Sequence, residues 1–139
     1  MKYAIELERD PSDEKEGILL QGVNEADYKI KKVNPIEYYA LFIKDLQGEI
    51  CGGISIILYY GCVSIDLLWV SPELRDQGWG SKLIEEALLF AKKKECLFAT
   101  AHTMDWQAVS FYQKLGFHIE FISKGYQYNS ELYVLRRNF

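Results

Sequence analysis

The chain has 139 residues, of which 49% are hydrophobic and 26% charged, and its formal net charge is −4. This composition excludes a disordered protein, and the length predicts one domain over residues 1–139. The acidic balance argues against nucleic-acid binding, which would require a basic patch. No apolar run approaches the ~20 residues that cross a bilayer, and the first residues do not resemble a signal peptide, so we expect a cytoplasmic protein with no membrane partner.

The sequence predicts both strands and helices along the chain. In order they are a strand at 2–8, one or two helices at 14–33 that break near Asn24, strands at 36–44, 49–59 and 63–70, a helix from Gly80, a strand at 96–102, a helix at 106–115, and strands at 117–123 and 131–137. Together they predict an α/β fold with a mixed, mostly antiparallel sheet and helices on both faces.

The three cysteines, Cys51, Cys62 and Cys96, are widely spaced, without a C-x-x-C motif or a histidine cluster. The sequence therefore predicts neither a metal site nor a redox pair, and we expect reduced, mostly buried thiols.

Residues 75–80, Arg-Asp-Gln-Gly-Trp-Gly, lie between a predicted strand and a predicted helix. The first turn of a helix has unpaired N–H groups and a partial positive charge, which together bind phosphate groups. The spacing excludes a Walker loop, and Leu83 stands where a dinucleotide fingerprint needs its third glycine. We expect a phosphorylated cofactor here; the alternative is an ordinary strand–turn–helix junction.

The pattern Arg75-x-x-Gly78-x-Gly80 resembles the pyrophosphate motif of the GCN5-related N-acetyltransferases (GNAT), which hold acetyl-coenzyme A. Residues 103–117 resemble the second signature of that family, at Asp105, Ala108, Tyr112, Lys114, Gly116 and Phe117. The resemblance covers about residues 36–139. It implies a GNAT-like sheet of about six or seven strands and an N-acetyltransferase that uses acetyl-CoA as co-substrate and no metal.

The resemblance also implies which residues contact the coenzyme. They are Leu68, Trp69 and Val70 through their backbone, Arg75, Asp76, Gln77, Gly78, Trp79, Gly80 and Ser81 in the loop, and Asp105 and Tyr112. Arg75 either contacts a phosphate or only braces the loop. Asp105 stands where the family usually has Asn, and it could equally cap the helix at 106–115.

The resemblance implies that Tyr112 is the catalytic acid, and a phenol can donate to the thiolate that leaves the thioester. The alternative is a core tyrosine beside Phe111 and Leu115. The acceptor amine must also lose a proton. Asp66, expected on one strand face with Ser64 and Leu68, is the first candidate base, and His102 is the second.

We expect direct transfer in a ternary complex, because no nucleophilic residue stands out. The acceptor pocket is expected from residues 20–35 and 124–130, which contain Tyr28, Tyr126 and Tyr128. The expected acceptor is a small primary amine, with a peptide or protein amine second. A homodimer through the strand containing residues 133–135 stays open. The alternatives are a non-catalytic coenzyme A sensor of the same fold and an unrelated α/β partner-binding domain.

Overall fold

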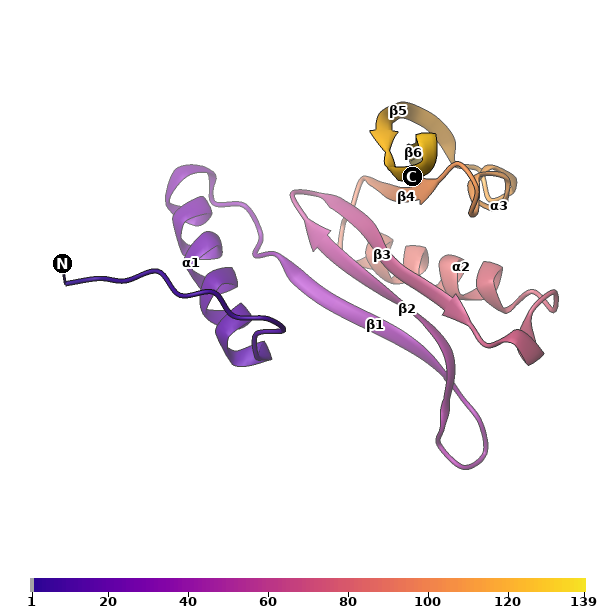
Figure 1. Cartoon of the computed structure of the whole chain (residues 1–139), viewed down its shortest axis with the longest axis horizontal. Helices are drawn as coiled ribbons and strands as arrows, with labels where there is room; N and C mark the ends of the chain where they lie inside the picture. The colour runs from indigo at the N-terminus through magenta and orange to yellow at the C-terminus, as the bar shows by residue number, and fades with distance from the viewer. Residues whose placement is uncertain (1) are drawn as a thin grey trace. The chain divides into compact units, whose positions relative to one another are not determined.

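The computed structural model describes residues 2–139, which form two compact units (Figure 1). The first, here called the N-terminal unit, ends at Ile36. The second, the sheet unit, comprises Glu37–Phe139. Each is described by itself below.

The N-terminal unit consists of an extended segment and one helix, α1 (Asp13–Lys31). The Ser12 hydroxyl caps α1 by accepting from the Lys15 N–H at 3.3 Å. The helix does not break at Asn24, because the Asn24 side chain accepts from the Ile36 N–H (2.8 Å) instead of competing for the helix backbone. The predicted strand at residues 2–8 is wrong: these residues are extended and exposed and pair with no strand.

The sheet unit contains six strands in the order β1-β2-β3-β4-β6-β5. Their bounds are β1 (Glu37–Lys44), β2 (Ile50–Tyr59), β3 (Cys62–Val70), β4 (Phe98–Met104), β5 (His118–Tyr126) and β6 (Ser130–Asn138). Only β3 and β4 run parallel; the other neighbours are antiparallel. This confirms the predicted α/β fold with a mixed, mostly antiparallel sheet. Because β6 lies between β4 and β5, residues 133–135 cannot form a free edge for a dimer, and that expectation is wrong.

Two helices and two short 3-10 turns connect these strands. They are α2 (Trp79–Lys93), α3 (Val109–Lys114), η1 (Pro72–Leu74) and η2 (Gln127–Asn129). The helix α3 begins three residues later than predicted, because two side chains hold the preceding residues in a loop. Gln107 accepts from the Met104 N–H (2.9 Å), and the Thr103 hydroxyl accepts from the Ala108 N–H (3.1 Å).

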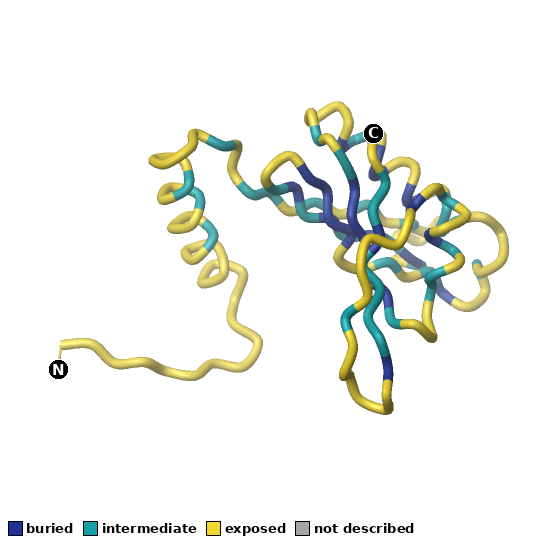
Figure 2. Tube along the Cα trace, turned by 90° about the horizontal axis from the view of Figure 1, so that it is seen from above, coloured by how far each residue is buried: buried dark blue, intermediate teal, exposed yellow. Residues whose placement is uncertain are grey.

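The hydrophobic core lies entirely within the sheet unit, between one face of the sheet and both of its helices. Alternate residues of β2, Ile54, Ile56 and Leu58, are buried in one cluster with Ile84 and Leu88 of α2. Dark blue buried segments gather in the sheet unit in Figure 2, whereas α1 contains no buried residue. Both α2 and α3 contribute to this cluster, so a helix on the opposite face stays a prediction.

Arg137 of β6 ties the two helices of this unit together. Its Nη1 donates to the Glu85 carboxylate of α2 (2.9 Å) and to the Leu115 carbonyl at the end of α3 (3.0 Å). These bonds fix the position of α3, from which Tyr112 projects.

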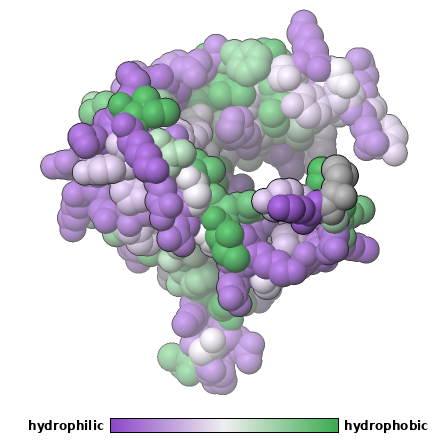
Figure 3. Space-filling model, turned by 90° about the vertical axis from the view of Figure 1, so that its left-hand side faces the viewer, coloured by the Kyte–Doolittle hydropathy of each residue, from purple (hydrophilic) through white to green (hydrophobic). Residues whose placement is uncertain are grey.

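Hydrophilic side chains dominate the molecular surface seen in Figure 3, with smaller hydrophobic patches between them. In the sheet unit, Tyr38, Phe42, Leu67 and Trp69 are each more than half exposed. Over residues 2–139, no helix has the length and apolar character needed to span a membrane.

Candidate functional site

The sheet opens between β3 and β4, which pair only from Cys62 with Phe98 to Ile65 with Ala101. Beyond Ile65 the two strands separate, and β3 continues in pairing with β2 alone (Figure 1). We call this opening the split. Along residues 66–70 the β3 backbone has no strand on the side of β4, so an extended, amide-bearing ligand can pair with it. The split thus exposes the edge of Leu68, Trp69 and Val70.

A β-bulge lies where the split begins. Ile65 pairs with Ile56 and Leu67 with Ser55, so Asp66 is an extra residue without a partner on β2. The Ser55 hydroxyl accepts from the Leu67 N–H at 3.1 Å. The bulge shifts the alternation of side chains: Leu68 packs against the core, whereas Asp66 is exposed. The prediction that Ser64, Asp66 and Leu68 share a face is therefore wrong.

The register of β3 and β4 places the two candidate bases at the same level on neighbouring strands. Ile65 and Ala101 are the last paired residues of β3 and β4, so Asp66 and His102 are the first residues beyond them. Both are exposed. The two strands begin to separate here, and each candidate stands at the vertex of the split.

The loop after β3 is braced by its own side chains. Arg75 Nε donates to the Val70 carbonyl at 3.1 Å, and Gln77 Nε2 donates to the Glu73 carbonyl at 2.9 Å. In this structure Arg75 therefore braces the loop, one of the two roles expected for it. Contact between Arg75 and a phosphate stays a prediction.

The start of α2 presents a row of unpaired donors. Gly78 occupies the N-cap position with φ 86°, a conformation that glycine adopts without strain, and no side chain caps the helix. The first helical bond runs from the Lys82 N–H to the Gly78 carbonyl (3.0 Å). Among residues 2–139, no backbone acceptor pairs with the N–H groups of residues 77–81. The first turn also contains no acidic residue, so its electrostatics favour an anion.

Gly80 matters for the packing of α3 against α2 as well as for access to the backbone N–H groups. A Cβ atom at this position would lie 3.4 Å from the Phe111 ring of α3. The absence of a side chain at Gly80 therefore allows α3 to approach the start of α2.

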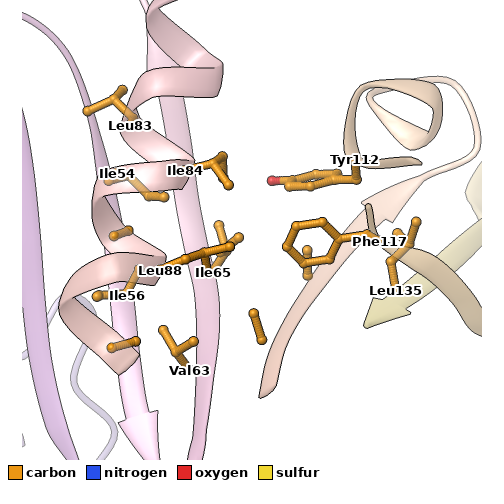
Figure 4. Close-up of a cluster of buried hydrophobic side chains, with 14 of the residues drawn as sticks. Ile54, Ile56, Val63, Ile65, Leu83, Ile84, Leu88, Tyr112, Phe117 and Leu135 are labelled. Atoms are coloured by element: carbon orange, nitrogen blue, oxygen red, sulfur yellow. The ribbon is translucent and has the colours of Figure 1, made fainter. Parts of the chain in front are cut away.

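Tyr112 lies in the core at the junction of α3 and α2. Its ring contacts Phe111 and Phe117 edge-on, with centroid distances of 5.2 and 5.3 Å, and only 5% of the residue is exposed. Figure 4 shows the hydroxyl end of the ring directed toward Ile84 of α2. Burial raises the pKa of Tyr112 to about 12, so the phenol is protonated at every physiological pH.

Asp105 does not cap α3, contrary to one of its two expected roles. The helix begins at Val109, and its N-cap residue is Ala108. Instead, Asp105 Oδ1 accepts from the Glu131 N–H (3.2 Å), and the Asp105 N–H donates to the Glu131 carbonyl (2.9 Å). This pair of bonds, the Asp105–Glu131 clamp, ties the loop after β4 to the start of β6.

An open pocket of about 590 Å³ lies beside this clamp. It is lined by Met104, Trp106, Tyr126, Gln127, Tyr128 and Ser130. Tyr126 and Tyr128 were expected in an acceptor pocket. Trp106 was missed, although its place directly after Asp105 in the second motif was a signal. Tyr28 lines a separate pocket of about 420 Å³ inside the N-terminal unit.

Comparison with known proteins identifies the family. The profile of the Acetyltransferase (GNAT) family matches residues 4–117. The chain belongs to the GNAT acetyltransferase family. Blasticidin-S acetyltransferase of Streptomyces morookaense is 33% identical to this GNAT chain over 91 residues, which cover 65% of the chain and 67% of that protein. The protein is accordingly an N-acetyltransferase.

Solved structures show the same GNAT fold. An acetyltransferase from Bacillus cereus superposes with a TM-score of 0.76 at 24% identity, covering 96% of this chain and 98% of that one. An aminoglycoside 6'-N-acetyltransferase crystallised with coenzyme A superposes with a TM-score of 0.67 at 17% identity, covering 73% of each chain. The predicted family, fold and enzyme class are confirmed, and the GNAT family uses acetyl-CoA as its acetyl donor.

Proposed function

We propose that this protein transfers an acetyl group from acetyl-CoA directly to a primary amine of a small molecule. The observation that carries the proposal is the row of unpaired N–H groups at residues 77–81, which lies next in the chain to the free edge of β3. The row suits a pyrophosphate, and the edge suits the amides of pantetheine. A coenzyme bound this way directs its thioester toward the vertex of the split, where Asp66 and His102 stand.

Tyr112 stabilises the leaving thiolate as a hydrogen-bond donor. An ordinary thiol has a pKa of about 8.5, whereas that of Tyr112 is about 12. Complete proton transfer from Tyr112 to a thiolate would therefore be uphill by about 3.5 pKa units, or about 5 kcal/mol. A buried, protonated hydroxyl that donates without giving up its proton avoids this cost.

Asp66 is the proposed base that takes a proton from the amine, with His102 as the second candidate. Asp66 is a carboxylate exposed at the vertex, so it can accept a proton directly or through a water and also attract a cationic amine.

Two of the three cysteines, Cys62 and Cys96, favour direct transfer over an acetyl-enzyme. Burial, with a smaller contribution from the neighbouring Cys96, raises the pKa of the Cys62 thiol to about 11. Burial likewise raises the pKa of Cys96. A protonated thiol is a poor nucleophile. Mass spectrometry after incubation with acetyl-CoA alone should show no acetylated cysteine; a stable acetyl-cysteine would contradict direct transfer.

The acceptor proposal draws on the relatives. Their names give blasticidin S and an aminoglycoside as the compounds they acetylate, both small molecules. A peptide or protein amine is the second candidate, and a coenzyme A sensor without turnover is the alternative function. We also propose that both units form one transferase domain in the cytoplasm, since the family match crosses the boundary at residue 36. A homodimer stays a prediction.

Calorimetric titration with acetyl-CoA, with ATP and NAD as controls, tests the cofactor. Selective binding of acetyl-CoA is expected. Thiol release from acetyl-CoA is then measured with blasticidin S, an aminoglycoside and a lysine-containing peptide. Turnover with an amine supports the enzyme; binding without any turnover favours the sensor, and no binding contradicts both.

A further inference from the structure

The pocket beside the Asp105–Glu131 clamp exposes three large aromatic side chains. Trp106 is 69% exposed, Tyr126 42% and Tyr128 97%. Within the described residues 2–139, none of these three rings packs against another aromatic ring. Exposed aromatic groups gathered around one hollow indicate a binding site, because their surface otherwise favours burial. Their faces are free to stack against a ligand.

The walls of this pocket are held in place without a ligand. Tyr128 and Asn129 both have φ 57°, a left-handed conformation that non-glycine residues rarely adopt. Such backbone persists only where its surroundings impose it, and it gathers at functional sites. The Asp105–Glu131 clamp joins the wall that contains Trp106 to the wall that begins at Ser130. The pocket is therefore preorganised.

The pocket also lies within reach of the proposed chemistry. Met104, one of its lining residues, ends β4 and follows His102 by two residues. Two residues of strand span about 7 Å. A ligand group in the pocket and an amine at the vertex of the split can thus belong to one small molecule with a short linker.

The lining suits a planar ring and offers a second cation no acidic partner. None of the six lining residues is acidic. The two nearest carboxylates in sequence are already engaged: Asp105 accepts from the Glu131 N–H, and Glu131 lies 3.9 Å from the Lys124 ammonium. Gln127 and Ser130 supply donors and acceptors for the polar edge of a ring. An aromatic or heteroaromatic ring between the aromatic faces satisfies these groups without an unpaired charge.

We propose that this pocket binds a planar aromatic or heteroaromatic ring of the acceptor, so that the acceptor is a ring-bearing primary amine with a short linker. This inference rests on the proposed acetyl transfer. Stacking on Trp106 and the two tyrosines selects for ring planarity, and the clamp holds the loop that contains Trp106 to the start of β6.

The kinetic test compares amines that differ only in the attached group. With acetyl-CoA, 2-phenylethylamine is expected to have a kcat/KM about tenfold above that of 2-cyclohexylethylamine, which has similar size but no aromatic face. Trp106→Leu should remove most of this preference while changing the cyclohexyl rate less than about threefold. Phe121→Leu, a matched change at an exposed aromatic residue of β5, should leave both rates unchanged. A diamine without a ring, 1,4-diaminobutane, is measured in the same assay. Equal kcat/KM values for the two ring amines, or a higher kcat/KM for 1,4-diaminobutane than for 2-phenylethylamine, would overturn the proposal.

A binding measurement separates this proposal from the proposed function. Ligand-observed NMR with 2-phenylethylamine and 2-cyclohexylethylamine, in the presence of coenzyme A, requires no turnover. Selective binding of the aromatic amine that is lost in Trp106→Leu supports the pocket even if no acetylation occurs. Equal binding of both amines, or selective binding that survives Trp106→Leu, overturns the pocket whether or not acetyl transfer is observed.

Discussion

Tyr112 has a titratable hydroxyl on a core side chain, so the stability of the folded protein should depend on pH in the alkaline range. Its pKa is about 12 in the folded protein, against about 10 in an unfolded chain. Between these values the folded state retains a proton that the unfolded state has lost, so stability is full below pH 10 and falls as the pH rises toward 12. The loss can reach about 2.7 kcal/mol, two pKa units at about 1.36 kcal/mol each.

Urea unfolding between pH 8 and pH 11.5 checks this prediction. Tyr112→Phe should reduce the alkaline slope between pH 10 and 11, where Cys62 also contributes, and should abolish most of it above pH 11. Cys62→Ala serves as a control for the other buried group, whose raised pKa of about 11 adds a slope that begins near pH 9. An unchanged slope above pH 10 in Tyr112→Phe would show that the Tyr112 hydroxyl titrates normally.

The same substitution tests catalysis separately. Tyr112→Phe removes only the hydroxyl, so the ring contacts with Phe111 and Phe117 remain. Loss of one preorganised donor to a developing anion lowers kcat by about 100-fold or more. We expect this fall in kcat with a nearly unchanged dissociation constant for acetyl-CoA, measured by calorimetry. A full rate in the variant would assign Tyr112 to the core alone.

At the scale of elements, the start of α2 is the most sensitive point for coenzyme binding. Gly80→Leu places a side chain where even a Cβ atom would lie 3.4 Å from Phe111, so the start of α2, with its row of free N–H groups, must shift relative to α3. We expect acetyl-CoA affinity to fall at least tenfold, by about 1.4 kcal/mol or more, in calorimetry. Gly22→Leu in α1 is the matched control, because nothing lies within 4 Å of its added Cβ. Equal affinities in wild type and Gly80→Leu would refute the pyrophosphate site.

If Asp105 acts through the Asp105–Glu131 clamp, its substitution should change a different kinetic constant than if Asp105 contacted the coenzyme. Asp105→Asn retains an oxygen that can accept from the Glu131 N–H, whereas Asp105→Ala removes this exposed hydrogen bond, which contributes about 0.5–1.5 kcal/mol to local order. Asp105→Ala should therefore raise KM for the amine and leave KM for acetyl-CoA unchanged, and Asp105→Asn should restore the amine KM. A rise in KM for acetyl-CoA alone would favour direct coenzyme contact.

The elements that the sequence predicted well are those whose hydrophobic residues recur with a clear period. The 3.6-residue stripe of α2 and the alternation in β2 follow directly from burial of one face. The failures have local causes. One extra residue in the bulge reversed the face of Leu68, and the side chains of Gln107 and Thr103 delayed the start of α3. The partner of Asp105 lies 26 residues away in the chain, a distance at which no local pattern operates.

At the scale of the whole molecule, the structural units differ in how they are stabilised. Every member of the buried cluster lies between Ile54 and Leu135, within the sheet unit. In the N-terminal unit, α1 buries no residue and depends on its Ser12 cap and on charges that complement the helix dipole at both ends. A cap and dipole charges alone contribute little to the stability of a helix.

A fragment comprising residues 37–139 should therefore fold. It retains the six strands, both helices of the core and the proposed coenzyme site, so we expect one cooperative urea transition and unimpaired acetyl-CoA binding. Circular dichroism and calorimetry measure the two properties, at low concentration because Leu67 and Trp69 expose apolar surface. If amine turnover alone fell, the N-terminal unit would contribute to the acceptor site, as the sequence predicts for residues 20–35. A fragment without a cooperative transition would show that residues 2–36 stabilise the sheet unit.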